Sequence, residues 1–232
     1  MKKITCCPVC GGQKFSNQSV LWPELIEDWQ LSPPEIAYID RQQGFSCASC
    51  GNNLRSMALA DAIMSAYQFS GTLNEFVKSK LAKKLNVLEI NEAGGLSGVM
   101  ANLKNYKLIR YPEHDMTKLI FEAGSFDLVI HSDTLEHVPN PIAGLMECRR
   151  VLRPRGRCIF TVPIVLGRMT RSRDGLKNSY HGAPGQDPED YIVHTEFGAD
   201  VWCYVADAGF SSIKIHNFEY PAGLAIEALV YE

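Results

Sequence analysis

The sequence predicts an α/β fold in which a doubly wound, mostly parallel sheet follows a small cysteine-bearing unit. Short apolar runs alternate with helix-like segments from residue 85 onward, which is typical of a parallel sheet covered by helices on both faces. Two Cys-x-x-Cys pairs precede that region. The chain has 232 residues, 46% of them hydrophobic, which suffices for one ordinary domain with a small extra module.

Charge and hydropathy exclude two classes of protein. The formal net charge is -3, so the surface as a whole does not attract nucleic acid, and we disfavour nucleic acid as a partner. The N-terminal stretch MKKITCCPVC contains two lysines but no apolar signal core, and no later window has the length of a membrane span. We therefore expect a cytoplasmic protein.

The paired cysteines predict a structural zinc site. Cys7 and Cys10 form the first pair, Cys47 and Cys50 the second, and a glycine follows each pair. Two intervening residues let both thiolates face one tetrahedral ion. Four free thiols or a redox pair are the alternatives, and Cys6 could compete with Cys7 as a ligand. The remaining cysteines lie in apolar patterns and are interpreted as inert core residues: Cys148, Cys158 and Cys203.

The segment between the cysteine pairs is expected to be helical. Residues 23–31 resemble a short helix, and Ser32-Pro-Pro-Glu35 is a capping box with proline at the first helical position. The second helix should therefore begin there and end near Gly44. Residues 53–68 are apolar on most sides, as expected for a helix packed between two units.

Strands and helices then alternate to the end of the chain. We expect strands at 86–90, 106–111, 126–131, 157–162, 212–218 and 225–231, and helices at 96–104, 140–152 and 198–208. Ligands of such sheets bind outside the carboxyl ends of the strands. The polar loop 132–139 follows a central strand, so its side chains should face that crevice.

The order VLEI, a glycine-containing turn, FDLVIHSDTLEHVPNP and ECRRVLRPRGRCIFTVP resembles the class I methyltransferases that use S-adenosylmethionine, in particular the ubiquinone-type and type 11 branch. The resemblance covers residues 85–232 and implies a Rossmann-like sheet. With the cysteine pairs, the chain also resembles bacterial methyltransferases that have an N-terminal zinc ribbon, some of which act on sugars or surface glycans. It implies a zinc-ribbon-like unit with a helical insert at 1–52 and a methyltransferase domain at 53–232, of which 53–84 are linking helices.

The resemblance also implies a cofactor site. Family members read E-x-G-x-G-x-G after the first strand, whereas here Asn91 and Ala93 replace two glycines and Gly95 matches the third. The chain is too short for a further helix and strand before residue 126. Asp115 could flank the adenine or simply cap a turn. The implied cofactor residues are Glu89, Asn91, Ala93, Gly94, Gly95, Glu113 (for the ribose), Asp115, Met116, Ser132, Asp133, Thr134 and Leu135.

Methyl transfer is an in-line displacement that depends on positioning, and an oxygen or nitrogen acceptor can need a base. The titratable groups expected near the crevice are His131, Asp133, His137, His181 and His194. We select His137, His181 and His194 as catalytic candidates. For each, hydrogen bonding within its loop is the alternative.

Eight arginines between residues 149 and 173 divide into two groups by position. Arg168, Arg171 and Arg173 follow the strand expected at 157–162, on the crevice side, and are predicted to bind an anionic group of the substrate. The long loop 167–190 is predicted to form a lid over it. The others precede that strand and are predicted to be solvated: Arg149, Arg150, Arg153, Arg155 and Arg157.

The sequence thus favours a methyltransferase that uses S-adenosylmethionine and a structural zinc, with a small-molecule or glycan-precursor hydroxyl as acceptor. Three alternatives stay open. A non-catalytic zinc-ribbon interaction protein could retain the fold without binding cofactor. A ribosomal-RNA methyltransferase is disfavoured by the net acidity, and a nicotinamide enzyme by the loop at 132–139.

Overall fold

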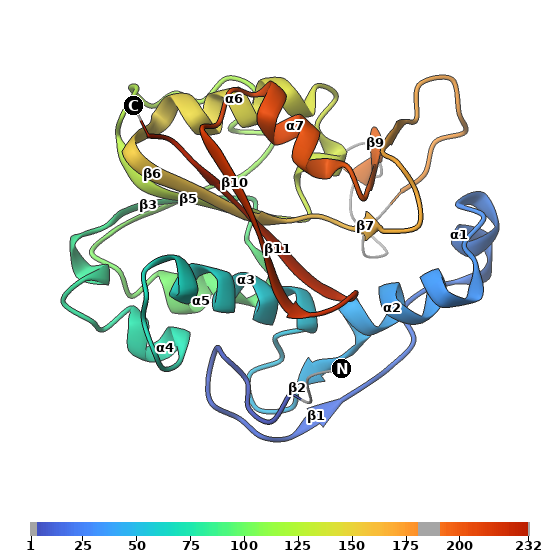
Figure 1. Ribbon diagram of the computed structural model, residues 1–232, viewed down its shortest axis with the longest axis horizontal. Coiled ribbons are helices and arrows are strands. Elements are labelled where there is room, and N and C mark those ends of the chain that lie inside the picture. The colour runs from blue at the N-terminus through green and yellow to red at the C-terminus, as the bar shows by residue number, and fades with distance from the viewer. Residues whose placement is uncertain (1–3, 181–190, 232) are drawn as a thin grey trace.

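The computed structural model describes residues 4–180 and 191–231 (Figure 1). A six-stranded sheet of order β10-β11-β6-β5-β3-β4 forms its centre. Strands β3, β4, β5 and β6 are parallel, and β11 runs antiparallel between β6 and β10. The α/β class and the mostly parallel sheet are therefore confirmed. The strands are β3 (Asn86–Ile90), β4 (Asn105–Ile109), β5 (Phe126–Ser132), β6 (Leu152–Thr161), β10 (Ser212–Glu219) and β11 (Gly223–Leu229).

Helices cover both faces of this sheet (Figure 1). On one face lies α3 (Leu54–Ala66), which contacts β6, β10 and β11. Its Asn53 cap accepts a hydrogen bond from the Ser56 N–H. The other face carries α6 (Pro141–Val151) and α7 (Val201–Asp207). Asn140 caps α6 by accepting from the Ala143 N–H at 3.0 Å, and Pro141 occupies the first turn, where its missing N–H costs nothing.

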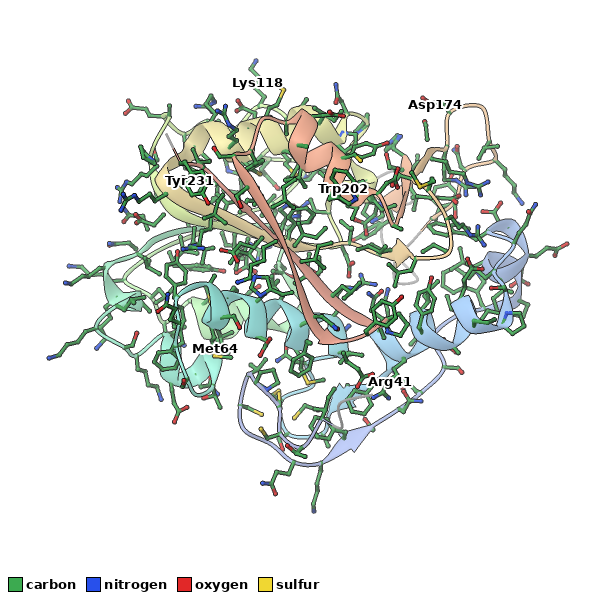
Figure 2. The ribbon with its side chains drawn as sticks, viewed as in Figure 1. Arg41, Met64, Lys118, Asp174, Trp202 and Tyr231 are labelled. Atoms are coloured by element: carbon green, nitrogen blue, oxygen red, sulfur yellow. The ribbon has the colours of Figure 1, made fainter. Side chains whose placement is uncertain are left out.

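The N-terminal unit contributes two helices and a small ribbon. Its elements are β1 (Phe15–Ser16), α1 (Pro23–Asp28), α2 (Pro33–Gly44) and β2 (Ser46–Cys47). The expected capping contact is present, because the Ser32 N–H and hydroxyl both donate to Glu35 Oε2 at 2.7 Å. Arg41 of α2 reaches the tip of the β10–β11 hairpin, where Nη2 donates to Glu219 Oε2 at 2.8 Å (Figure 2).

The hydrophobic core is continuous across residue 52. Cys7, Val9 and Cys47 of the N-terminal unit are buried in one cluster with α3 and with Val87 of β3. A second cluster lies between the sheet and α6 and α7, and a small third one joins α1 and α2 to Val165 and Val193. The division of the chain at residue 52 stays a prediction, and packing couples the two parts.

Several elements differ in length from expectation. The strand expected at 157–162 is longer, since β6 begins at Leu152 and includes residues 153–156. Arg155 within this extension has φ +66°. The helix expected at 96–104 is reduced to η2 (Gly94–Leu96) and α5 (Ser97–Met100). No helix or strand lies between β4 and β5, as the short spacing predicted. The remaining short elements are α4 (Leu73–Phe76), η1 (Ala82–Lys84), η3 (Leu135–His137), β7 (Ile164–Val165), β8 (Arg171–Ser172) and β9 (Thr195–Gly198).

Candidate functional site

Two cavities lie at the carboxyl end of β5 and share one wall. The larger has a volume of about 650 Å³ and the smaller about 300 Å³. Asp133, His137 and Tyr191 line both. Asp133 follows the buried strand directly and adopts φ +49°, a left-handed conformation that is uncommon for a non-glycine residue but that aspartate tolerates better than most.

The larger cavity contains part of the implied cofactor set. Asn91, Asp115, Met116, Asp133 and Thr134 line it, together with His137 and His194. The rest of its wall was not named individually from the sequence, and it comes from the turn after β3, the end of β4 and the loop after it, the loop before α6, the start of α6, and Tyr191. These residues are Glu92, Arg110, Tyr111, His114, Thr117, Val138, Pro139, Asn140, Ala143 and Tyr191.

Asn91 performs the backbone role of the first missing glycine. It adopts φ +55°, which asparagine tolerates better than most residues. Its N–H donates to the Ile109 carbonyl at 2.9 Å, and its Oδ1 accepts from the Tyr111 N–H at 2.8 Å. The side chain therefore fastens the end of β4 to the turn after β3.

The glycines of this turn approach α3, and neither lines a cavity. A Cβ added to Gly94 would overlap Ser56 Oγ, and one added to Gly95 would overlap Asn52 Oδ1. That these glycines contact the cofactor stays a prediction. Their small size allows the start of α3 to cover the turn, a long-range contact that the local sequence could not indicate.

Glu89 lies beneath the turn and has no solvent exposure. Its Oε1 accepts from the Ala93 N–H at 2.7 Å and from the Ser97 hydroxyl, while Oε2 accepts from the Tyr106 hydroxyl at 2.8 Å. The carboxylate is therefore occupied within the fold and shapes the turn from below. The other implied residues outside the cavity are Ala93 and Leu135 (buried), Ser132 (hydroxyl bonded to that of Thr161 at 2.7 Å) and Glu113 (exposed).

Arg55 is a site residue that sequence reasoning missed. It is fully buried in α3, forms an ion pair with Asp133, and donates from Nη2 to Gln42 Oε1 at 2.8 Å. Burial lowers the pKa of Arg55 to about 10, and the charge of Glu136 partly opposes this shift. The sequence did contain a signal for this residue, because Arg55 is a cation within the apolar helical segment 53–68.

His137 lies between the cavities with a fixed tautomer. Its Nδ1 is 3.0 Å from the Ile192 carbonyl, and a carbonyl can only accept, so Nδ1 carries the proton of the neutral ring. The Nε2 lone pair is then 3.8 Å from Glu136 Oε1. Glu136 is buried and lines the smaller cavity.

The other histidines occupy different environments. His194 lines the larger cavity, and its pKa is lowered by burial and by the neighbouring His137. His181 lies outside the described residues. His131 lies in the core under α6, stacked on Phe160 at 4.6 Å between centroids, and burial lowers its pKa to about 3. The expectation that His131 reaches the crevice is therefore wrong, because its ring is buried in the core beside Cys148 of α6 and Cys158 of β6.

The three arginines predicted to bind substrate all have carboxylate partners in this structure. Arg168 donates to Glu35 at 2.9 and 3.0 Å, Arg171 donates to Glu196, and Arg173 contacts both Glu196 and Asp28. None of them lines either cavity. Arg168 and Arg173 join α2 and α1 to the segment around β8 and β9, and Arg171 joins β8 to β9. Their role in substrate binding stays a prediction.

The four predicted zinc ligands come together at the base of the N-terminal unit. Cys7 and Cys50 Sγ are 3.7 Å apart, as are Cys10 and Cys47 Sγ, and all four lie within 4.8 Å of one another. Tetrahedral zinc with Zn–S bonds of about 2.3 Å requires sulfurs separated by roughly 3.8 Å. The cluster therefore has the dimensions of a four-thiolate zinc site, and the exposed Cys6 is not part of it.

Within the described residues, no helix has both the length and the apolar character needed to cross a bilayer.

The chain is similar in sequence to known methyltransferases. Residues 49–160 match a family model described as a methyltransferase domain, of type 11. Ubiquinone biosynthesis O-methyltransferase from Histophilus somni is 24% identical over 159 residues, covering 64% of this chain and 61% of the relative. Its counterpart from Aromatoleum aromaticum is 25% identical over 158 residues, covering 64% and 60%. The chain thus spans about three fifths of the length of these relatives.

Solved structures of S-adenosylmethionine-dependent methyltransferases are also similar. The protein from Methanosarcina mazei has 13% identity and a TM-score of 0.41, covering 64% of this chain and 93% of that one. A possible histamine N-methyltransferase from Thermotoga maritima has 12% identity and a TM-score of 0.40, covering 76% and 97%.

Proposed function

This chain carries a class I S-adenosylmethionine-dependent methyltransferase domain, and from that premise we propose that it transfers a methyl group to a hydroxyl of a small acceptor. The larger cavity would hold the cofactor and the smaller one the acceptor. The observation that carries this proposal is the shared wall of Asp133, His137 and Tyr191, since donor and acceptor must meet in line within one site.

The larger cavity fits the cofactor in size and chemistry. Met116 offers an apolar surface for the adenine, and Asn91 and Thr134 add polar residues to the lining. For the ribose we propose Glu92, because it lines the cavity whereas Glu113 does not. Glu92 is held by Arg110 Nε at 3.0 Å. When bound, S-adenosylmethionine supplies an activated methyl carbon on its sulfonium.

We propose His137 as the group that accepts the acceptor's proton. The Ile192 carbonyl lies 3.0 Å from Nδ1, so a neutral ring would carry its proton there and would take up the acceptor's proton at Nε2. The ring lines both cavities, and Nε2 is 3.8 Å from Glu136 Oε1. Arg55 in turn holds Asp133 at the same wall.

The N-terminal cysteines are proposed to hold one structural zinc. Four thiolates leave no open position on the ion, so the metal would fix the fold of the unit and take no part in transfer. Gly12 N–H and Asn52 Nδ2 already donate toward Cys10 and Cys50 Sγ at 3.4 Å, as expected for sulfurs that become thiolates.

Titration with S-adenosylmethionine by calorimetry tests the cofactor assignment. Wild-type protein should bind one cofactor per chain, and Glu92→Gln should weaken binding about tenfold by removing a charge-assisted hydrogen bond worth about 1.5 kcal/mol. Glu113→Gln is the matched control, an exposed acid nearby that lines neither cavity, and should bind normally. Absence of wild-type binding would favour the non-catalytic alternative.

A further inference from the structure

The smaller cavity is closed by the N-terminal unit. Half of its wall comes from residues 20–43, including Trp22, Leu25 and Trp29 of the α1 region and Ile39 of α2. These residues precede the segment that matches the methyltransferase family, which begins at residue 49. The acceptor side of the site is therefore built largely from a part of the chain that the family match does not include.

This wall is held firmly against the rest of the molecule. Asp28 of α1 pairs with Arg173 at 3.0 Å, and Glu35 of α2 pairs with Arg168. Trp29 Nε1 donates to Ser179 Oγ at 2.9 Å, and Tyr38 Oη accepts from the Leu166 N–H at 2.9 Å. Contacts from two helices to separate loops fix the cavity before any ligand binds.

The polarity of the cavity is divided between its two ends. Asp133, His137 and Tyr191 belong to the wall shared with the larger cavity, and Arg55 and Glu136 lie beside them. Most of the remaining lining is apolar and aromatic, from α1, α2 and β7, and Gln43 of α2 is its other polar residue. The indole N–H of Trp29 already has Ser179 as its partner. A ligand therefore finds most of its hydrogen-bonding groups at the shared wall.

The volume of the cavity and the charges in its wall further restrict the class of ligand that it can bind. The volume of about 300 Å³ is about twice that of an engineered apolar cavity that accepts benzene. The cation in the described wall, Arg55, is already paired with Asp133. Phosphate or multiple sugar hydroxyls placed at the apolar end would lose hydration without gaining partners.

We propose that the N-terminal unit is the acceptor-binding module, and that it takes an uncharged one- or two-ring compound whose hydroxyl points to the wall of Asp133, His137 and Tyr191. This inference rests on the proposed function. It replaces the glycan precursor expected from sequence with a ring that lies against Trp22 and Trp29.

The test uses 2-naphthol as a neutral two-ring hydroxyl compound and UDP-glucose as a sugar nucleotide. Binding is followed by calorimetry on the full chain saturated with S-adenosylmethionine. Trp22→Ala should weaken 2-naphthol binding about tenfold, because it removes one aromatic ring that packs against the ligand. A tenfold change corresponds to roughly 1.4 kcal/mol of binding free energy. Trp202→Ala is the matched control, since Trp202 on α7 (Figure 2) is 47% exposed against 42% for Trp22 and lines neither cavity.

Both variants should keep wild-type affinity for S-adenosylmethionine and wild-type melting temperature. Saturable binding of 2-naphthol that is lost in Trp22→Ala and kept in Trp202→Ala supports the proposal. Binding of UDP-glucose in place of 2-naphthol, equal loss in both variants, or no binding of 2-naphthol to cofactor-loaded protein overturns it. Failure of S-adenosylmethionine itself to bind overturns the proposed function instead, and is measured separately.

Discussion

The two cavities differ in how they are built. The larger one is formed by the ends of neighbouring parallel strands and the loops that leave them, so its residues follow short patterns along the chain. The smaller one is formed where residues 20–43 pack against segments more than a hundred positions later. The wall of the larger cavity thus depends mainly on short connections along the chain, whereas the wall of the smaller cavity depends on the association of distant segments.

The largest expected effect on stability comes from removing two cysteines of the four-cysteine cluster. If the proposed zinc is bound, the double variant Cys47→Ser/Cys50→Ser should not retain it and should lose more than about 5 kcal/mol of folding free energy, since metal binding to such sites contributes on the order of 10 kcal/mol. Because the core is continuous with α3, both cavities should be lost together. Metal analysis and thermal unfolding measure this.

Cys6→Ser is the control for that experiment, because Cys6 is exposed and lies outside the cluster. It should retain about one zinc per chain. A double variant that melts at the wild-type temperature would show that the cluster does not hold the unit together.

Next in size is the loss of Arg55. Arg55→Ala removes a buried cation from the partly exposed Asp133 and from the neighbourhood of the buried Glu136. Because water can solvate Asp133, the cost should not exceed the roughly 3 kcal/mol at the lower end of the range for fully buried pairs. Denaturant unfolding should show this loss, and adding Asp133→Asn should recover part of it. Arg110→Ala, at an exposed pair with Glu92, should cost much less than Arg55→Ala. Equal losses of unfolding free energy in Arg55→Ala and Arg110→Ala would mean that the Arg55–Asp133 ion pair does not stabilise the shared wall.

Acid stability tests the core beneath the larger cavity. His131 has a folded-state pKa of about 3, below its unfolded value of 6.5, so unfolding takes up a proton as the pH falls below 6.5. Stability should therefore decrease by about 1.4 kcal/mol per pH unit between pH 6.5 and pH 3. His131→Leu should abolish this dependence and be more stable at pH 5 by about 2 kcal/mol. A parallel pH profile in the variant would assign the acid sensitivity to other groups.

The smallest effect concerns the arginines around β8. Arg171→Ala removes an ion pair with Glu196 in a side chain that is 44% exposed, and Arg153→Ala removes one with Asp127 in a side chain that is 42% exposed. Each should cost less than about 1 kcal/mol and leave cofactor and acceptor affinity unchanged. A selective rise in acceptor KM for Arg171→Ala would restore the anion-binding role expected from sequence.

Much of the fold could be predicted because it follows local rules. The apolar run ending at Ser132, the proline after Asn140 and the capping box at Ser32 each specify an element through its own residues. The paired cysteines specified a cluster through spacing alone. These features need no knowledge of what lies across the molecule.

The predicted site was less complete, for a physical reason. A glycine turn has the same sequence whether its backbone faces a ligand or a helix, and here Gly94 and Gly95 face α3. Likewise, the sequence does not show that Arg168 pairs with Glu35 or that Arg171 pairs with Glu196. Partners that are distant in sequence decided each of these cases.

The short connection between β4 and β5 leaves β4 at the margin of the sheet, paired with β3 alone among the described strands. Its outer backbone groups are a template onto which another chain's strand could add. Lys107 projects from this strand over the Phe121 ring at 5.1 Å, so a positive charge lies along the margin. Charged side chains of this kind oppose edge-to-edge aggregation, and Lys107 is placed to act in this way at the β4 margin.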